Sequence, residues 1–331
     1  MTVLRPTRRR SAVVALSALL VLTACGGGSA DTAGPASGSA SGSASGPAQT
    51  TTVSTNLGDR EVPADPVRVA ALDNTSFQTL LDLGITPVAV PKGLLPRSGF
   101  EAWADDADIA DAGNHREPVL EAISEAEPDL IIGGYRFQDY QGDLEKIATT
   151  IDIAPADDSE GGYVEGLKAQ TTTLGEIFGK QDEAARLVAE FERAEQEAAA
   201  QTSGESVFLA VASGGRIDNG ASRIGRIIEP LQLTNVLAAE GDSIHHDSGL
   251  APETIAQLNP DWMIVMDRDA GTGESDATPA RQLIAAQEAW ENTTFVTRDH
   301  VVHLPPTFYV TEGIQAYTEV YDQIASAFRA A

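Results

Sequence analysis

The chain has 331 residues, of which 42% are hydrophobic, so it is long enough to bury one large core or two moderate ones. It carries 49 acidic and 22 basic residues, a formal net charge of -27. This charge disfavours binding to nucleic acid phosphates and to anionic lipid head groups. Nucleic acid is therefore excluded as a partner, and the hydrophobic content excludes disorder throughout the chain.

The N-terminus has the pattern of an export signal. Arginines at positions 5, 8, 9 and 10 precede an apolar run over residues 12–22, which leads into LTAC (22–25). As a helix this run is about 16 Å long, roughly half the thickness of a bilayer core, which is too short for a permanent span. We expect residues 1–24 to be removed as a signal peptide, and the three consecutive arginines are compatible with either Sec or Tat export.

Cys25 is the only cysteine, so no disulfide within the chain can stabilise an exported fold. The order Leu, small residue, Ala, Cys after an apolar run resembles the lipobox of bacterial lipoproteins, in which the cysteine is acylated and becomes the mature N-terminus. This resemblance predicts an extracytoplasmic protein anchored to the cell membrane through a lipid on Cys25. A buried thiol is disfavoured, because residues 26–50 offer too little apolar surface to build a core around it.

Residues 26–50 consist almost entirely of Gly, Ser, Ala, Pro and Thr, a composition that cannot offset the entropy of its own ordering. We assign residues 25–54 to the lipidated cysteine and a flexible linker. A linker of this kind has an average span of roughly 25 to 30 Å, which keeps a globular body attached to a membrane at a distance.

The rest of the chain alternates short apolar runs with amphipathic segments. VRVAAL (67–72) is followed by a helix-like segment at 76–84 and by TPVAV (86–90), a pattern typical of a parallel α/β sheet. A weak repeat relates EAISEAEPDLII (121–132) to ETIAQLNPDWMI (253–264). In each copy a helix ends before Pro-Asp and leads into a buried strand, which predicts two similar lobes.

Between the two copies of the repeat, apolar residues recur at the spacing of a helix. We therefore predict an N-terminal α/β lobe over residues 55–162, a single long spanning helix within 163–203, and a C-terminal α/β lobe over 204–331 that ends in a helix. The predicted fold class is α/β, with two Rossmann-like lobes and a ligand cleft between them at the carboxyl ends of the strands.

These features together resemble the helical-backbone periplasmic binding proteins, which serve ferric siderophores and vitamin B12. The resemblance covers residues 60–330 and is carried, after the lipobox, by DAGNHREPVLEAISEAEPDLIIGGYR (111–136), SIHHDSGLAPETIAQLNPDWMIVMDRD (243–269) and LPPTFYVTEGIQAY (304–317). It implies a monomeric substrate-binding lipoprotein of an ABC importer. Its partners would be a ferric siderophore as the ligand and a permease dimer with its ATPase, and no intrinsic cofactor is implied.

The resemblance is closest to binders of catecholate siderophores, and it maps three cleft arginines onto Arg136, Arg223 and Arg268. Arg226 competes with Arg223, because both precede the helix-like IIEPLQL. A ferric triscatecholate carries three negative charges, and a guanidinium stays charged and offers planar donors to catecholate oxygens. Lys92 is expected among the ligand contacts as well.

The resemblance also places His246 and Tyr309 where they could bind the iron of the siderophore directly. Two catecholates fill four of six iron positions, which would leave two for these side chains. A zinc site formed by His245, His246 and Asp247 is disfavoured, because no further ligand in the sequence completes it. Finally, Glu121 and Glu253 are equivalent in the repeat, and the resemblance implies that they dock the protein onto the permease.

Other functions remain as alternatives. Cobalamin carries little net charge and would not require three cleft arginines, whereas haem would prefer a more aromatic pocket than 5% aromatic residues promise. A hydroxamate siderophore is a further possible ligand. The sequence contains no Gly-x-Ser-x-Gly elbow, no Walker loop and no Gly-x-Gly-x-x-Gly after a strand, so a secreted enzyme is a remote alternative.

Overall fold

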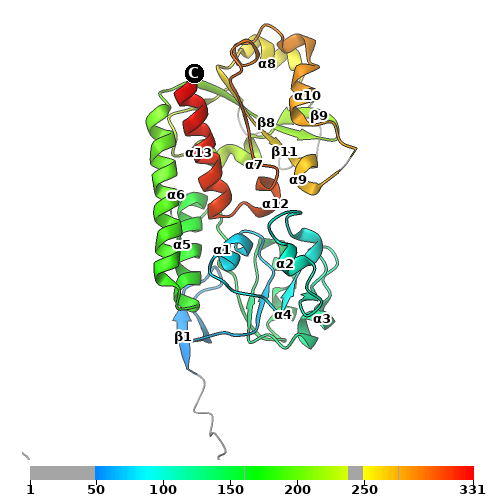
Figure 1. The fold of residues 1–331 in the computed structure, drawn as a ribbon, viewed down its shortest axis with the longest axis vertical. Coiled ribbons are helices and arrows are strands. Elements are labelled where there is room, and N and C mark those ends of the chain that lie inside the picture. The colour runs from blue at the N-terminus through cyan, green and yellow to red at the C-terminus, as the bar shows by residue number, and fades with distance from the viewer. Residues whose placement is uncertain (1–48, 160, 238–248, 275) are drawn as a thin grey trace, which may run out of the picture. The chain divides into compact units, whose positions relative to one another are not determined.

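The computed structural model describes residues 49–331 apart from 160, 238–248 and 275, and the described residues belong to one compact unit. The predicted signal peptide, Cys25 and most of the predicted linker lie outside the described residues. Two α/β lobes are present, with longer helices running beside them (Figure 1). The predicted fold class is thus confirmed.

The N-terminal lobe is built on a parallel sheet of five short strands in the order β5-β4-β3-β6-β7. Alternate residues enter hydrophobic cores on opposite faces: Val69 and Ala71 pack on one face, Ala70 and Leu72 on the other. Both faces are covered, as is usual for parallel strands. The strands are β3 (Val69–Ala71), β4 (Ala89–Val90), β5 (Ala110–Asp111), β6 (Leu130–Ile132) and β7 (Thr149–Ile151). The helices are α1 (Phe77–Asp82), α2 (Glu101–Ala104), α3 (Leu120–Glu125) and α4 (Gln141–Leu144), with 3₁₀ turns η1 (Lys92–Leu94) and η2 (Tyr135–Tyr140).

The C-terminal lobe has a parallel sheet in the order β10-β8-β11-β12, with β9 pairing antiparallel to β8. Phe208 and Ala210 of β8 face one core, and Val207 and Leu209 face the other. The strands are β8 (Ser206–Ser213), β9 (Arg216–Asn219), β10 (Thr234–Asn235), β11 (Trp262–Asp267) and β12 (Val301–His303). The helices are α7 (Ala221–Ile224), α8 (Pro252–Leu258), α9 (Arg268–Thr272), α10 (Ala280–Ala285), α11 (Thr294–Thr297) and α12 (Phe308–Thr311), with 3₁₀ turns η3 (Gly225–Ile228) and η4 (Glu288–Trp290).

The folded part begins earlier than the predicted linker boundary. Strands β1 (Thr50–Val53) and β2 (Arg60–Pro63) form an antiparallel hairpin, and Val53 and Val62 are buried in the core of the N-terminal lobe. Three threonines and a valine in β1 are β-branched, which favours a strand over a flexible linker. Residues 50–53 therefore form a strand, where the sequence predicted part of a flexible linker.

The connection between the lobes consists of two packed helices, α5 (Gly162–Ile177) and α6 (Gln181–Gln201), instead of the predicted single spanning helix. Gly179 (φ +63°) lies in the turn between them, in the left-handed region that glycine enters at low cost. The first part of α5, with Tyr163 and Leu167, lies in a core of the C-terminal lobe, and its last part, with Leu174, lies in a core of the N-terminal lobe. One helix thus belongs to the cores of both lobes.

The C-terminal helix α13 (Ile314–Ala330) packs against α6 and also reaches the N-terminal lobe (Figure 1). Gln315 Nε2 donates hydrogen bonds to Thr79 Oγ1 at 3.2 Å and to Asp82 Oδ2 at 2.9 Å, both on α1. In the part of the chain that the structure describes, no helix is both long enough and apolar enough to cross a membrane.

A buried polar network fixes the loop after β3 to α5. The Asp73 carboxylate accepts hydrogen bonds from the Thr75 hydroxyl at 2.6 Å and from Gln170 Nε2 at 2.8 Å, and Asp73 is 1% exposed. Burial raises the pKa of Asp73 to about 6, although the hydrogen bonds from Thr75 and Gln170 oppose this effect. Ionisation of Asp73 is therefore less favourable in the folded protein than in the unfolded chain.

We expect the free energies of unfolding of the wild type and of Asp73→Asn to differ by an amount that depends on pH. Between the unfolded-state pKa near 3.8 and the folded-state value of about 6, the folded protein retains a proton that the unfolded chain has lost. The contribution of Asp73 to the free energy of unfolding should thus fall by about 3 kcal/mol as the pH rises through this window. Urea unfolding of both proteins at four pH values measures it, and a pH-independent difference would contradict the assignment.

Candidate functional site

The two sheets place polar side chains at equivalent points. In each sheet the strand order reverses beside the first strand, between β3 and β6 in one lobe and between β8 and β11 in the other, and ligands of α/β proteins bind at such points. Arg136 follows β6, and its Nε donates to Asn74 Oδ1, which follows β3, at 2.8 Å. Arg268 follows β11, and its Nη1 lies 3.4 Å from Ser213 Oγ at the end of β8.

Both lobes line one cavity of about 580 Å³ at these strand ends. Five lining side chains are cationic and two are acidic, in a chain whose net charge is -27. The cations are Lys92, Arg97, Arg116, Arg136 and Arg268, the acids are Glu101 and Asp105, and other lining residues include Asn74, His115, Gly271, Thr272 and Tyr309. The cavity is therefore a locally basic site in an acidic protein, suited to an anionic ligand.

Tyr309, on the short helix α12, lies beside two arginines. The guanidinium carbons of Arg223 and Arg268 are each 5.5 Å from the centre of its ring, within the range of cation–π attraction. Helix α9 packs closely against α12, because a Cβ atom on Gly271 would lie 2.7 Å from Pro306 O and 3.1 Å from Tyr309 Cβ. The position of the phenol is thus set by close packing and by two cationic neighbours.

Carboxylates balance both of these arginines. Arg223 forms an ion pair with Glu312, which is 1% exposed, and Arg268 Nη1 lies 3.2 Å from Asp269 Oδ1 and 3.8 Å from Glu274 Oε1. Burial raises the pKa of Glu312, although Arg223 and other arginines oppose this effect. Arg223 contacts the ring of Tyr309 but is not among the residues that line the cavity.

Arg226 is directed elsewhere. Its guanidinium carbon lies 4.0 Å from the centre of the Tyr163 ring, and its Nε lies 3.0 Å from Asp157 Oδ1. It lines a separate hollow beside α7. Of the two arginines between which the sequence left a choice, the structure places Arg223 at Tyr309.

The other predicted site residues are placed as follows. Lys92 lines the cavity, and its Nζ donates to Asp106 O at 2.6 Å. Glu121 and Glu253 are exposed in the first turns of α3 and α8. His246, like Cys25, lies outside the described residues, so its predicted contact with iron stays a prediction.

Sequence reasoning missed several lining residues, above all His115, Arg116, Arg97 and Asn74. The strand-end rule, that polar side chains just after a strand line the cleft, fits Arg136 after β6 and applies equally to Asn74 after β3 and to His115 and Arg116 after β5. Burial lowers the pKa of His115, and the positive charges of Arg136 and Arg116 lower it further. The surroundings of this imidazole therefore favour its neutral form.

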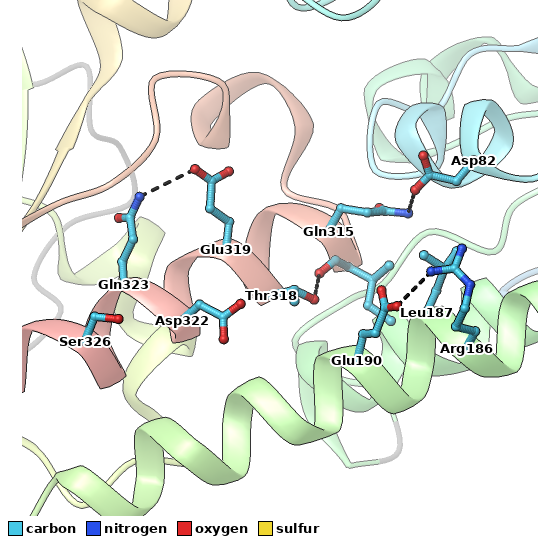
Figure 2. A pocket seen from close by; sticks show the side chains of 11 residues that line it. Asp82, Arg186, Leu187, Glu190, Gln315, Thr318, Glu319, Asp322, Gln323 and Ser326 are labelled. Carbon is cyan, nitrogen blue, oxygen red and sulfur yellow. Dashed lines mark hydrogen bonds and ion pairs between the residues drawn. The ribbon is translucent and has the colours of Figure 1, made fainter. Parts of the chain in front are cut away.

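A larger hollow of about 760 Å³ lies along α6 and α13 (Figure 2). Four of its five charged lining residues are acidic. Glu190 is paired with Arg186 at 2.8 Å, and Asp82 accepts a hydrogen bond from Gln315, while Glu319 and Asp322 add further negative charge. It lies on the flank formed by the long helices, away from the strand ends. Neither its charge nor its position fits an anionic ligand.

Comparisons with known proteins agree with this geometry. A family model described as periplasmic binding protein matches residues 69–307. The petrobactin-binding protein YclQ of Bacillus subtilis is 27% identical over 326 residues, which covers 94% of this chain and 96% of the relative. The ferric-anguibactin-binding protein FatB of Vibrio anguillarum is 28% identical over 286 residues, covering 83% of this chain and 86% of the relative.

Solved structures show the same architecture. The crystal structure of YclQ superposes with a TM-score of 0.73 at 25% identity and covers 85% of this chain and 99% of that chain. The siderophore-binding protein BauB, bound to a complex between two molecules of acinetobactin and ferric iron, gives a TM-score of 0.73 at 26% identity with the same coverage. Both are similar to this chain over the two lobes and the helices beside them.

The close packing of α9 against α12 predicts the effect of Gly271→Ala. The added methyl group would press on Pro306 O and Tyr309, so we expect the free energy of unfolding to fall by about 1 to 3 kcal/mol. Gly225→Ala, in the same lobe, is the matched control, because a Cβ there meets no atom within 4 Å. Urea unfolding compares the two variants, and equal stabilities would show that α9 does not hold Tyr309 in place.

Proposed function

Because the chain belongs to the periplasmic binding protein family, we propose that it is the substrate-binding protein of an ABC importer and that its ligand is a ferric siderophore. The relatives named above are a petrobactin-binding protein, a ferric-anguibactin-binding protein and a siderophore-binding protein that holds acinetobactin and ferric iron. They align with nearly the whole folded part of this chain. The family consists of binding proteins, so the chain is not an enzyme. Its task is to capture the ligand and release it unchanged.

The charge of the cavity supports a catecholate siderophore in particular. Five cationic and two acidic side chains line it, although acidic residues outnumber basic ones by more than two to one in the whole chain. A ferric triscatecholate is trianionic, whereas a ferric trihydroxamate and cobalamin carry little or no net negative charge. The positive charge of the cavity thus stabilises a bound catecholate complex and adds little to the binding of a trihydroxamate complex or cobalamin.

Tyr309 is our candidate for direct contact with iron. If the cargo carries only two catecholates, two of the six iron positions remain, and a phenolate oxygen is a hard ligand of the kind that Fe(III) prefers. A free tyrosine ionises near pH 10, but a trivalent ion stabilises the phenolate in the same way as it acidifies bound water. We retain His246 as the proposed second ligand.

Ligand capture tests the function directly. We expect the protein purified without its first 25 residues, and incubated with a mixture of ferric triscatecholate, bis-catecholate and trihydroxamate complexes, to retain a catecholate complex of unchanged mass in native mass spectrometry. Retention of only the trihydroxamate would contradict the catecholate proposal, and a chemically altered ligand would contradict a binding function.

The visible spectrum of the retained bis-catecholate complex then tests Tyr309. A phenolate–iron bond should shift the charge-transfer band in the wild type and not in Tyr309→Phe, which keeps the ring beside the two arginines. Identical spectra and affinities in the two proteins would show that Tyr309 lines the cavity without binding iron.

Glu121 and Glu253 are proposed to dock onto basic pockets of the permease, one from each lobe. Both are exposed acids in the first turn of a helix, where the helix dipole alone would favour them by about 0.3 to 1 kcal/mol. We expect the double variant Glu121→Ala, Glu253→Ala to lose ligand uptake in cells while its affinity for the ligand is unchanged. Glu125→Ala, an exposed acid at the end of α3, is the control; normal uptake by the double variant would exclude docking through this pair.

A further inference from the structure

The cations that line the cavity or contact Tyr309 differ in their partners. In the C-terminal lobe, Arg223 is balanced by Glu312, and Arg268 is balanced by Asp269 and Glu274. A ligand anion that approaches these arginines must share them with carboxylates already in place. The net electrostatic gain is small, because the field of each pair is largely cancelled beyond the pair itself.

Three cations of the N-terminal lobe, Lys92, Arg97 and Arg116, have no carboxylate within ion-pair distance among the residues that the structure describes. We call them the N-lobe cations. Lys92 Nζ donates to the backbone carbonyl of Asp106 at 2.6 Å, and Arg97 Nη2 lies 3.3 Å from the carbonyl of Thr272. Both partners are neutral, and the two acids that line the cavity, Glu101 and Asp105, form no ion pair with these cations. All three side chains line the cavity.

A single carboxylate fixes two of the three backbone segments to each other. Asp111 Oδ1, at the end of β5, accepts hydrogen bonds from the backbone N–H of Lys92 at 3.1 Å and from that of Gly113 at 3.0 Å. Asn114 Oδ1 then accepts from the backbone N–H of Arg116 at 2.9 Å. The loops that carry Lys92 and Arg116 are therefore held together before any ligand arrives, which lowers the entropy cost of binding.

Arg97 extends this surface across the cleft to the C-terminal lobe. Its guanidinium lies directly on Gly273, where a Cβ atom would be 1.8 Å from Arg97 Nε. Gly273 ends α9, the helix that begins with Arg268. The side chain of Arg97 thus spans the cleft beside the cavity and rests on a weak contact to one carbonyl, which a ligand oxygen could replace.

We propose that the N-lobe cations form the anion subsite that reads the charge of the ligand, while Arg223 and Arg268 position Tyr309 and offer hydrogen bonds with little net charge. This inference rests on the proposed function and deepens it. The anionic oxygens of the ligand lie against η1, the loop that follows it and the loop after β5. Arg97 and Arg116 are exposed, so the attraction is screened by salt.

The test compares charge-removing variants of the mature chain with two ferric probes, a triscatecholate of charge three minus and a neutral trihydroxamate. The triple variant Lys92→Gln, Arg97→Gln, Arg116→Gln should weaken the triscatecholate on the order of 30-fold at low salt and only a few-fold at high salt, and the trihydroxamate by less than about twofold. Arg268→Gln should weaken both probes by similar factors. Arg298→Gln, which removes an exposed charge away from the cavity, should change neither.

The proposal is overturned if the triple variant keeps the wild-type ratio of the two affinities, or if Arg268→Gln alone abolishes that ratio. Citrate, a trianion without iron, separates this inference from the siderophore function. A citrate-dependent rise in the melting temperature of the wild type that disappears in the triple variant supports the subsite even if no siderophore binds. An equal rise in both proteins, or none in the wild type, overturns it.

Discussion

The loop after β3 is the point at which the two lobes and the connecting helices meet, and its contacts leave no room for additional atoms. A Cβ atom on Gly313 would lie 2.4 Å from Thr75 O, and one on Gly134 would lie 2.7 Å from Asp73. Asn74 Nδ2 donates to Thr311 O at 3.1 Å across the lobes, while its Oδ1 accepts from Arg136. The orientation of Arg136 in the cavity thus depends on the same loop through which the N-terminal lobe contacts α12 and the start of α13.

The buried carboxylate of Glu312 links the backbone near this loop to the charges of the site. Glu312 lies between α12 and α13 in a left-handed conformation (φ +50°), which is unusual for a residue with a side chain. Its buried carboxylate pairs with Arg223, so the backbone turn that directs α13 along α6 also supplies the charge that balances an arginine beside Tyr309. Packing and electrostatics in the C-terminal lobe cannot be varied independently. Lys92 and Arg97 in the N-terminal lobe have no comparable restriction, because the side chain of each bonds to a backbone carbonyl, that of Asp106 or of Thr272.

The fold class followed from the sequence, because helix-to-strand patterns are local signals. Arg136, Arg268 and Tyr309 were predicted from the resemblance to the family, and all three line the cavity. The connecting segment was predicted as one spanning helix, whereas the structure divides it into α5 and α6 at Gly179, although the helical spacing of apolar residues continues on either side. The contact of Arg97 with Gly273 joins residues far apart in the chain, and no local pattern predicts it. Nor could the sequence show that Glu312 rather than a ligand balances Arg223, because pairing depends on how the lobes pack. His115 was within reach of the strand-end rule and was overlooked.

The contact between α13 and α1 bears on the order in which the protein can fold. The hydrogen bonds from Gln315 to Thr79 and Asp82 join residues that are 236 and 233 positions apart in the chain. Contacts between such distant residues form slowly, because the entropy of closing a long loop is lost before the contacts can stabilise the fold. The N-terminal lobe therefore cannot complete this part of its surface on its own, and does so only once α13 has packed against it.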